Sequence, residues 1–283
     1  MHVIPGSHPG ESRFFRVAGC DNGAMGTEDV LQRSLDDGIV TLVLNRPRQY
    51  NALSRALLEA LHAEIEKLSR DESARVIIIT GAGRAFCAGH DLKEMRSGAG
   101  EREIEALFAS CSAMMQKLIE LPQPVIAAVN GIAPAAGCQL VAQCDLAVAS
   151  ENARFAASGV NLGLFCSTPA VALSRNVSRK RAAEMLFTGD FIDASQALDW
   201  GLVNRVAPHD RLMESARELA NNLKSKPREV LALGKALFYR QLEASLGAAY
   251  RDASRTISSN MAGEIAREGV DAFLAKVPPR WKG

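Results

Sequence analysis

An unbroken run of apolar, mostly β-branched residues, Val76-Ile77-Ile78-Ile79-Thr80, constrains the fold of this chain more than any other segment. Successive side chains of a strand point to opposite faces of its sheet. A strand without polar alternation is therefore typical of a sheet that is covered on both faces. The run ends at the turn Gly81-Ala82-Gly83. We expect a fully buried strand here.

Strands and helices alternate on both sides of this run. Further strands are expected over residues 39–44, 125–130 and 146–149. Ser54 is a suitable N-cap for a helix, and the apolar residues that follow it share one helical face, namely Leu57, Leu58, Leu61, Ile65 and Leu68. Another helix is expected over residues 101–120 and a third up to about residue 142.

The C-terminal quarter of the chain is predicted to be helical. Asp193 and Gln196 have the spacing of a capping box, Gly201 suits a helix stop, and Pro227 suits a first helical turn. Strand–helix alternation followed by helices alone indicates an α/β core with a helical C-terminal subdomain. We expect a poorly structured extension over residues 1–29, a core over 30–210 and the helical subdomain over 211–283.

Composition excludes several classes of function. The formal net charge is +1 and Lys and Arg do not cluster, so we expect no nucleic-acid partner. The apolar runs are too short to span a bilayer. The six cysteines form no CxxC pair or Cys/His cluster, so we expect reduced thiols, no metal site and an intracellular protein, cytoplasmic or, in a eukaryote, in the mitochondrial matrix.

Two motifs carry the chemistry. A loop of small residues, Arg84 to Met95, follows the buried run, and its glycine permits close backbone approach to a ligand. The second motif, Ala133-Pro-Ala-Ala-Gly-Cys-Gln139, lies between the strand at 125–130 and an apolar helix. Such a turn places backbone N–H groups at a helix N-terminus, where they can stabilise a developing oxyanion.

Together with Asn45-Arg46-Pro47, Asn51-Ala52-Leu53 and Thr188-Gly189-Asp190, these motifs resemble the crotonase (enoyl-CoA hydratase/isomerase) superfamily over residues 30–283. Residues 163–168, with 135–139, more narrowly resemble the branch of enoyl-CoA hydratase domain-containing protein 3. The resemblance implies the α/β crotonase (ClpP-like) fold, a spiral of ββα units with a helical C-terminal trimerisation subdomain. It also implies homotrimers or homohexamers and an acyl-CoA thioester as substrate, with no further cofactor.

The same resemblance assigns the oxyanion hole to the backbone N–H groups of His90 and Ala136. The family usually has three glycines where this chain has Ala135-Ala136-Gly137. Since only the N–H is needed, alanine is acceptable if its φ is negative.

The resemblance also locates the acid–base positions, and none of them carries a carboxylate. The two glutamates of family hydratases fall on Gln139 and Gly159, and an aspartate of other branches falls near Ser167. A carboxylate with a tuned pKa can accept or deliver a proton, whereas an amide and a hydrogen atom cannot. We therefore expect poor hydration of crotonyl-CoA.

Several side chains remain as pocket candidates. The His90 imidazole either reaches the pocket as a proton carrier or contributes only its backbone. Cys166, Ser167 and Thr168 either line the acyl pocket or form a polar turn that caps the next helix. We interpret Asp91 as a residue that organises the loop and Asp145 as structural.

CoA requires local cations for its phosphates even on a neutral protein. The resemblance points to Arg46, Arg48 and Lys93, to backbone contacts of Ala88 with adenine, and to Phe273 and Lys276 from a neighbouring subunit. Two rivals remain open beside a family enzyme: a non-catalytic acyl-CoA-binding or regulatory protein, and a reaction that needs only the oxyanion hole, such as decarboxylation of a malonyl-type thioester. Installing Gln139→Glu with Gly159→Glu is the mechanistic test that the sequence suggests.

Overall fold

A six-stranded sheet forms the centre of the molecule in a computed structural model that describes residues 29–97 and 100–281. The strand order is β1-β2-β3-β4-β6-β9, in which β1 is antiparallel to β2 and the other pairs are parallel. The strands are β1 (Leu31–Asp36), β2 (Ile39–Leu44), β3 (Val76–Gly81), β4 (Val125–Val129), β6 (Leu146–Ser150) and β9 (Arg205–Ala207). The extension expected over residues 1–29 lies outside the described residues, apart from Asp29.

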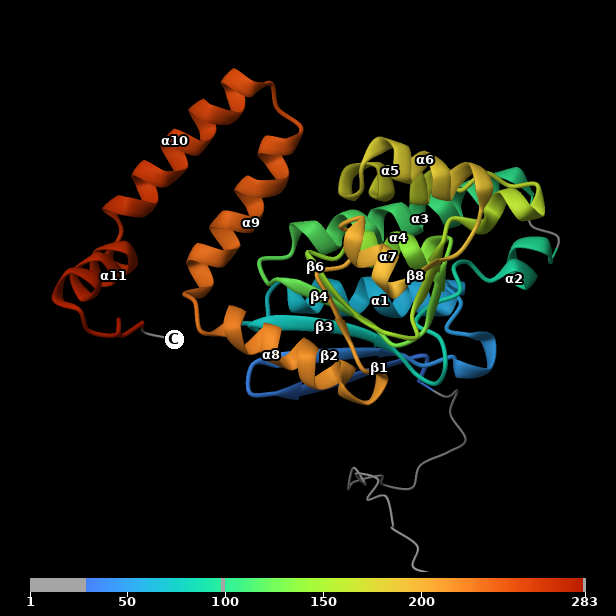
Figure 1. Ribbon diagram of the computed structural model, residues 1–283, viewed down its shortest axis with the longest axis horizontal. Coiled ribbons are helices and arrows are strands. Elements are labelled where there is room, and N and C mark those ends of the chain that lie inside the picture. The colour runs from blue at the N-terminus through green and yellow to red at the C-terminus, as the bar shows by residue number, and fades with distance from the viewer. Residues whose placement is uncertain (1–28, 98–99, 282–283) are drawn as a thin grey trace, which may run out of the picture.

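Helices cover both faces of this sheet, as the unbroken run in β3 predicts. Ile77 and Ile79 pack into the larger core on the side of α1 (Arg55–Leu68) and α3 (Glu101–Glu120). Val76 and Ile78 point to the opposite face, where they meet α8 (Leu212–Lys224). Figure 1 shows α8 on one side of the strands and α1, α3 and α4 (Ala136–Gln143) on the other. The two-residue period of the strand thus divides one apolar run between two cores.

A smaller sheet carries the next part of the chain. Its strands, in the order β5-β7-β8, are β5 (Ile132–Pro134), β7 (Arg154–Ala156) and β8 (Ile192–Asp193). Helix α7 (Ala194–Asp199) packs against this sheet, and the other short helices are α2 (Leu92–Arg96), α5 (Ser167–Asn176) and α6 (Arg179–Thr188). Single helical turns occur at η1 (Pro47–Gln49), η2 (Ser158–Leu162) and η3 (His209–Arg211).

The helix boundaries follow the predicted capping residues in most places. The Ser54 hydroxyl accepts from the Leu57 amide at 3.2 Å, and Asp193 and Gln196 form the predicted capping box. Pro227 is one position off, because it is the N-cap of α9 (Arg228–Leu242) and precedes the first turn. A polar cap for α5, one of the two alternatives for residues 166–168, is not formed, because the N-cap is Cys166 and its side chain makes no capping hydrogen bond.

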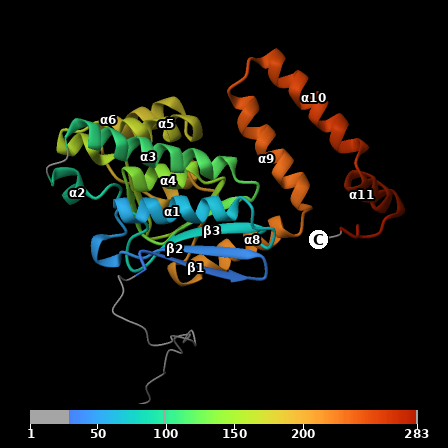
Figure 2. The same cartoon turned by 180° about the vertical axis from the view of Figure 1, so that it is seen from behind.

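The last three helices form an arm that projects from the body, as the red and orange ribbons show (Figures 1 and 2). They are α9, α10 (Leu246–Ala262) and α11 (Glu264–Ala275). The arm exposes large apolar side chains, including Leu246, Tyr250, Phe273 and Leu274. By sequence α8 falls within the expected C-terminal subdomain, but it packs on the sheet. None of the helices in residues 29–97 and 100–281 has the length and apolar character needed to span a bilayer.

A buried ionic network attaches α9 to the body. The Lys235 ammonium lies 2.6 Å from the Asp145 carboxylate and donates to the carbonyls of Leu118 and Gln123 at 2.9 and 3.0 Å. Tyr239 donates to the other oxygen of Asp145 at 2.8 Å. Burial lowers the pKa of Lys235 and raises that of Tyr239. Asp145 is therefore structural in this chain.

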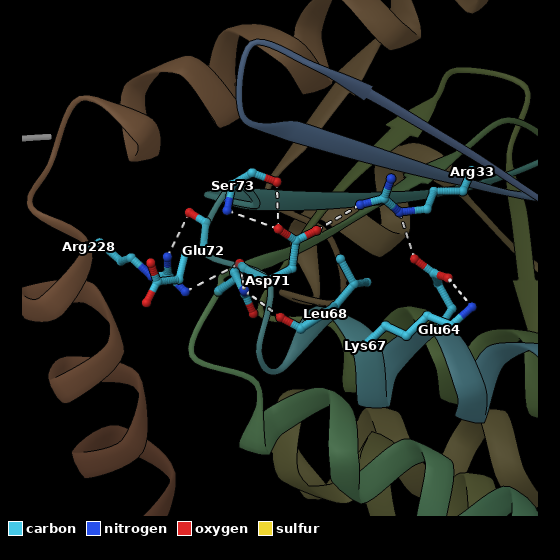
Figure 3. Close-up of polar contacts among 9 residues, drawn as sticks. Arg33, Glu64, Lys67, Leu68, Asp71, Glu72, Ser73 and Arg228 are labelled. Carbon is cyan, nitrogen blue, oxygen red and sulfur yellow. Dashed lines mark hydrogen bonds and ion pairs between the residues drawn. The ribbon is translucent and has the colours of Figure 1, made fainter.

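A second set of polar contacts ties the first strand and the arm to the loop between α1 and β3 (Figure 3). Arg33 of β1 pairs with Glu64 of α1 at 2.7 Å and with Asp71 of the loop at 2.8 Å. Arg228, at the start of α9, donates to the carbonyl of Glu72 at 2.7 Å. The loop thus links β1 and α9, two elements that are far apart in sequence.

Candidate functional site

The sequence motifs gather at the carboxyl ends of β2, β3 and β4. These ends lead into Asn45-Arg46, the loop at 82–91 and the turn at 130–136. Neighbouring parallel strands present their carboxyl ends at one edge of a sheet, where ligands of α/β proteins bind. The fully buried Asn51 joins two of the segments: its side chain accepts from the Arg46 amide at 2.9 Å and donates to the Ala85 carbonyl at 2.8 Å.

The loop after β3 packs directly against the turn before α4. The amide of Phe86 donates to the carbonyl of Ile132 at 3.1 Å. A Cβ atom on Gly137 would lie only 1.9 Å from the carbonyl oxygen of Cys87, so this position requires glycine. A Cβ on Gly89 would lie 3.1 Å from the amide nitrogen of Ala136. The loop therefore brings His90 next to the start of α4.

The two amides assigned to the oxyanion hole have no hydrogen-bond acceptor within the described part of the chain. His90 and Leu53 form an isolated parallel bridge, whose bonds join Leu53 N–H to Gly89 O at 2.8 Å and Asp91 N–H to Leu53 O at 3.2 Å. His90 N–H takes no part in that bridge. Ala136 is the first residue of α4, and the first amides of a helix have no intrahelical acceptor. Both donors are thus available to a ligand.

Ala135 departs from the sequence expectation. Its φ is 50° and its ψ is −119°, a conformation that suits glycine, so Ala135 does not meet the condition of a negative φ. Ala136 meets the condition, because it is absent from the residues with positive φ. Ala135 lies where the chain passes from β5 into α4, and the Ala136 nitrogen that follows it lies beside Gly89 of the loop at 82–91. Strain of this kind at a ligand site is worth about 1–3 kcal/mol.

The His90 imidazole is largely buried. Its ring packs edge-on against Phe108 of α3 with the centroids 4.8 Å apart, and Nε2 has no hydrogen-bond partner in the described residues. Burial lowers its pKa to about 4. The side chain is therefore neutral at pH 7 and a weak base. Sequence reasoning missed Phe108, because nothing in its local pattern marks a contact with a loop 18 positions earlier.

The two glutamate positions differ in their surroundings. Gln139 lies in α4, is only 4% exposed, and its Oε1 atom has no partner in the described residues. Gly159 donates its amide hydrogen to Cys166 Sγ at 3.2 Å. A Cβ at position 159 would lie 2.8 Å from the Leu164 carbonyl oxygen and 2.9 Å from Cys166 Sγ. Any side chain at position 159 therefore requires the segment at 164–166 to shift.

The remaining pocket candidates do not form a nucleophilic site. Burial raises the pKa of the Cys166 thiol, so it stays protonated at neutral pH. Ser167 is exposed, and its hydroxyl donates to the carbonyl of Phe165 at 3.3 Å. Within residues 29–97 and 100–281, no group of three or more His, Cys, Asp or Glu side chains is placed to hold a metal ion.

The cations predicted to bind CoA differ in their pairing and in their exposure. Arg46 pairs with Asp91 at 3.0 Å and donates to the Ala52 carbonyl at 2.6 Å, so it holds the loop together. Asp91 caps α2 by accepting from the Lys93 amide at 3.1 Å, which agrees with its expected organising role. Arg46 and Arg48 line a groove of about 610 Å³. Arg48 and Lys93 are exposed.

Ala88 and the two arm residues complete the set. The Ala88 amide donates to the Tyr50 carbonyl at 3.0 Å, so a ligand can contact only the Ala88 carbonyl. Phe273, which is 81% exposed, lies in α11, and Lys276 follows that helix. Within one chain α11 lies at the opposite end of the molecule from α2 (Figure 1). Their expected approach from a neighbouring subunit remains a prediction.

Comparisons with known proteins agree with this geometry. Residues 34–283 match the enoyl-CoA hydratase/isomerase family. The chain is 48% identical to enoyl-CoA hydratase domain-containing protein 3, mitochondrial, of Rattus norvegicus, over 87% of this chain and 82% of that protein. An enoyl-CoA hydratase structure from Mycobacterium smegmatis is 53% identical, with a TM-score of 0.89 over 90% of this chain and 100% of that one.

The human enoyl-CoA hydratase domain-containing protein 3 structure is 46% identical, with a TM-score of 0.86 over 89% of this chain and 100% of that one. These matches confirm the expected crotonase fold and the narrower resemblance to domain-containing protein 3. One assignment accounts for the sheet, for the loop packed against its small-residue turn, and for the relatives. The chain belongs to the enoyl-CoA hydratase/isomerase family.

Proposed function

We propose that this protein binds an acyl-CoA thioester and polarises its carbonyl oxygen between the backbone N–H groups of His90 and Ala136. The observation that carries the proposal is the pair of amides without acceptors that the packing of Gly89 on Ala136 brings together. A thioester enolate concentrates negative charge on one oxygen. Two preorganised donors in a site without water stabilise that charge by about 3 kcal/mol each.

Polarisation can be measured without knowing the reaction. The carbonyl stretch of butyryl-CoA labelled with ¹³C at the thioester carbon should move to lower frequency on binding, in isotope-edited infrared difference spectra. The double variant Ala135→Gly/Ala136→Pro removes one donor, because proline has no N–H and is accepted at the first position of a helix. Ala135→Gly alone is the matched control.

We expect the control to keep the carbonyl shift and the double variant to lose a large part of it. Free CoA should bind both variants with similar affinity, because the cations proposed to hold its phosphates, Arg46, Arg48 and Lys93, lie outside this turn. An unshifted carbonyl stretch in the unmodified protein, with butyryl-CoA bound, would contradict the proposal.

Simple hydration is not the activity that this site favours. The positions to which the family resemblance assigns carboxylates hold Gln139 and Gly159, and the third falls near Ser167. The His90 imidazole has a pKa lowered to about 4 by burial. We therefore expect hydration of crotonyl-CoA to be slow. Turnover equal to that of ordinary hydratases would contradict this expectation.

The missing carboxylates favour a second candidate, a reaction in which the substrate supplies its own carbanion. Decarboxylation of a malonyl-type thioester forms an enolate without a protein base, and the oxyanion hole then carries its charge. Release of CO₂ from malonyl-CoA or methylmalonyl-CoA would support it. Tight calorimetric binding without hydration, isomerisation, decarboxylation or hydrolysis would instead support a non-catalytic acyl-CoA-binding protein.

The exposed arm supports a proposal about assembly. Phe273, Leu274 and neighbouring apolar side chains are open to solvent in the single chain, and contiguous apolar surface of this kind is typical of subunit interfaces. We propose a homotrimer or homohexamer in which Phe273 and Lys276 contact CoA held by the next subunit, beside Arg46, Arg48, Ala88 and Lys93.

A further inference from the structure

An arginine of the body caps the end of the last helix before the arm. Residues 225–227 join α8, which packs on the sheet, to α9, the first helix of the arm. Arg75 donates to the carbonyls of Lys224 and Lys226 at 3.2 and 2.8 Å. The last carbonyls of a helix have no intrahelical partner and carry partial negative charge, which suits an arginine. Arg75 is itself fixed, because its amide donates to the Gly38 carbonyl at 2.7 Å.

An arginine of the arm makes the converse contact. Arg228, the first residue of α9, donates to the carbonyls of Glu72 and Asp71 at 2.7 and 3.3 Å (Figure 3). The segment just before β3 thus gives a donor to the connection and receives a donor from the arm. A guanidinium group suits this use, because its planar set of donors can bind two carbonyls in a fixed geometry. We call Arg75 and Arg228 together the arm clamp.

The arm clamp is the first of two attachments on one face of α9. Lys235 follows Arg228 by seven positions, nearly two helical turns, so both side chains leave the same side of the helix. Lys235 donates to the Gln123 carbonyl at 3.0 Å. The Gln123 side chain donates at 3.3 Å to the same Asp71 carbonyl that accepts from Arg228. Attachments about 10 Å apart along one helix fix its direction, whereas a single attachment would let it pivot.

The direction of α9 decides where the end of the arm lies. The helix is about 22 Å long, so a tilt of about 10° at its start moves its other end by about 4 Å. Helix α10 packs on α9, and α11 packs on α10, so both move with it. Phe273 lies in the last turn of α11 and Lys276 caps that helix. A displacement of about 4 Å is enough to break a hydrogen bond or an ion pair made by either residue.

We infer that Arg75 and Arg228 are positioning residues for CoA binding. They hold the arm at the angle at which Phe273 and Lys276 reach the CoA of the next subunit. The inference rests on the proposed binding of a CoA thioester and on the proposed assembly. The arm clamp touches no ligand, and it acts on CoA affinity only through the arm.

The test compares two ligands that differ at the nucleotide end. Butyryl-CoA carries phosphates that Lys276 can bind, whereas butyryl-pantetheine carries none. In isothermal titration calorimetry, we expect the Kd of butyryl-CoA to rise about fivefold in Arg228→Met and in Arg75→Met. The Kd of butyryl-pantetheine should stay within about twofold. Arg211→Met is the matched control, because its exposed partner Glu214 lies on the same helix, and it should change neither Kd.

A double-mutant cycle establishes whether the arm clamp acts through the arm. Lys276→Met should itself weaken the binding of butyryl-CoA. Arg228→Met should then add less than it costs alone, because the contact that it positions is already lost. Arg228→Lys keeps a cationic donor and should recover part of the affinity. Light scattering should give the same mass for the clamp variants as for the unmodified protein, and thermal unfolding establishes that each variant is folded.

Each other outcome overturns the inference in a distinguishable way. Strict additivity of Arg228→Met and Lys276→Met means that the clamp acts independently of the arm contact. Equal weakening of butyryl-pantetheine means that the substitutions damage the whole site. A lower mass means that the clamp serves assembly instead. An unchanged Kd in Lys276→Met means that the arm does not reach CoA. Failure of butyryl-CoA to bind the unmodified protein overturns the proposed function as well, whereas the other results leave thioester binding intact.

Discussion

Ala135 is a residue that the surrounding site holds in a strained backbone conformation. Its φ of 50° and ψ of −119° are accessible to alanine only with strain, and they occur immediately before the first amide of α4, which lies beside Gly89. The surrounding contacts fix this conformation, including the Ala135 N–H bond to the Ala156 carbonyl at 2.8 Å. The family's glycine at this position raised the question of the Ala135 backbone, but the sequence could not give its φ, because packing between distant segments sets it.

Replacing Ala135 by glycine should stabilise the protein. Glycine adopts positive φ without strain, and this gain exceeds the entropy that glycine adds to the unfolded chain. We expect the free energy of unfolding in urea to rise by about 0.5–1 kcal/mol. Ala133→Gly, in the neighbouring strand β5, is the matched control and should lower it. A lower stability of Ala135→Gly would show that the strain is absent.

Gly159 and Cys166 should be energetically coupled. A methyl group at Gly159 meets Cys166 Sγ and the Leu164 carbonyl, so Gly159→Ala should destabilise the protein by about 1–3 kcal/mol. Adding Cys166→Ala removes one obstacle and should recover part of the loss. A double-mutant cycle in urea measures the coupling, and strict additivity would contradict it. The same crowding means that Gly159→Glu needs a smaller residue at position 166.

The buried His90 should make stability depend on pH. Its pKa is lowered to about 4, from an unperturbed value of about 6.5 in the unfolded chain. Between these pH values the unfolded state binds a proton on this histidine and the folded state does not. The contribution of neutral His90 to stability is therefore fully present above pH 6.5 and decreases as the pH falls toward 4. The slope from this group is at most about 1.4 kcal/mol per pH unit. His90→Phe should flatten urea-derived stability between pH 6.5 and 5, and an unchanged slope would contradict this origin.

At the scale of elements, local pattern predicted the buried strands and the amphipathic helices but not the edges of the sheets. The apolar residues of β3 form one unbroken run, and the strand is buried along that run. The apolar residues of α1 recur at helical spacing, and they are the buried ones. β1 has only Leu31 buried, so it carries no apolar alternation. β5 and β7 have three residues each and pair with distant partners.

The candidate site likewise has features that local sequence predicted and features that it did not. Backbone donors followed from the motifs, because a small-residue turn before a helix has a local signature. The contact of His90 with Phe108 and the position of Cys166 beside Gly159 depend on how separate segments pack, so the sequence left them open. Arg46 was expected to bind CoA, and its pairing with Asp91 adds a structural role that spacing could not show.

Helix α9 should detach from the body when Lys235 is removed. Lys235→Met leaves Asp145 buried without its cation, which costs about 3 kcal/mol or more. We expect lower stability in urea, together with faster hydrogen exchange of α9 than of the central strands. Lys224→Met removes a lysine whose partner, Asp37, lies at the surface, and this control should have a far smaller effect. Equal effects of the two variants would contradict a special role for the buried pair.

At the scale of the whole molecule, the projecting arm is difficult to reconcile with a monomer. A chain of 283 residues does not usually leave so many large apolar side chains exposed on one set of helices. The buried Lys235 network fixes where the arm leaves the body, so the arm presents its apolar residues in a defined direction. A trimer or hexamer would cover them.

A charge on the arm should therefore disrupt assembly. Size-exclusion chromatography with light scattering should give three or six times the mass of the chain for the unmodified protein. Phe273→Asp should shift the mass toward the monomer and weaken CoA binding, because a charge is costly in an apolar interface. Leu35→Asp, on the exposed edge strand β1, is the matched control and should keep the assembly. A monomer in the unmodified protein would contradict the proposed assembly.

The close packing of Gly137 against Cys87 has a consequence for how the protein can be observed. The two amide donors belong to segments that meet only when the native backbone contacts form, with no clearance for even a methyl group. A polarised carbonyl therefore requires both segments to be in their native positions at the same time. The shifted infrared band of a bound thioester therefore reports that the Gly137–Cys87 contact is intact. The shift should disappear when this contact opens locally, before the sheet itself unfolds.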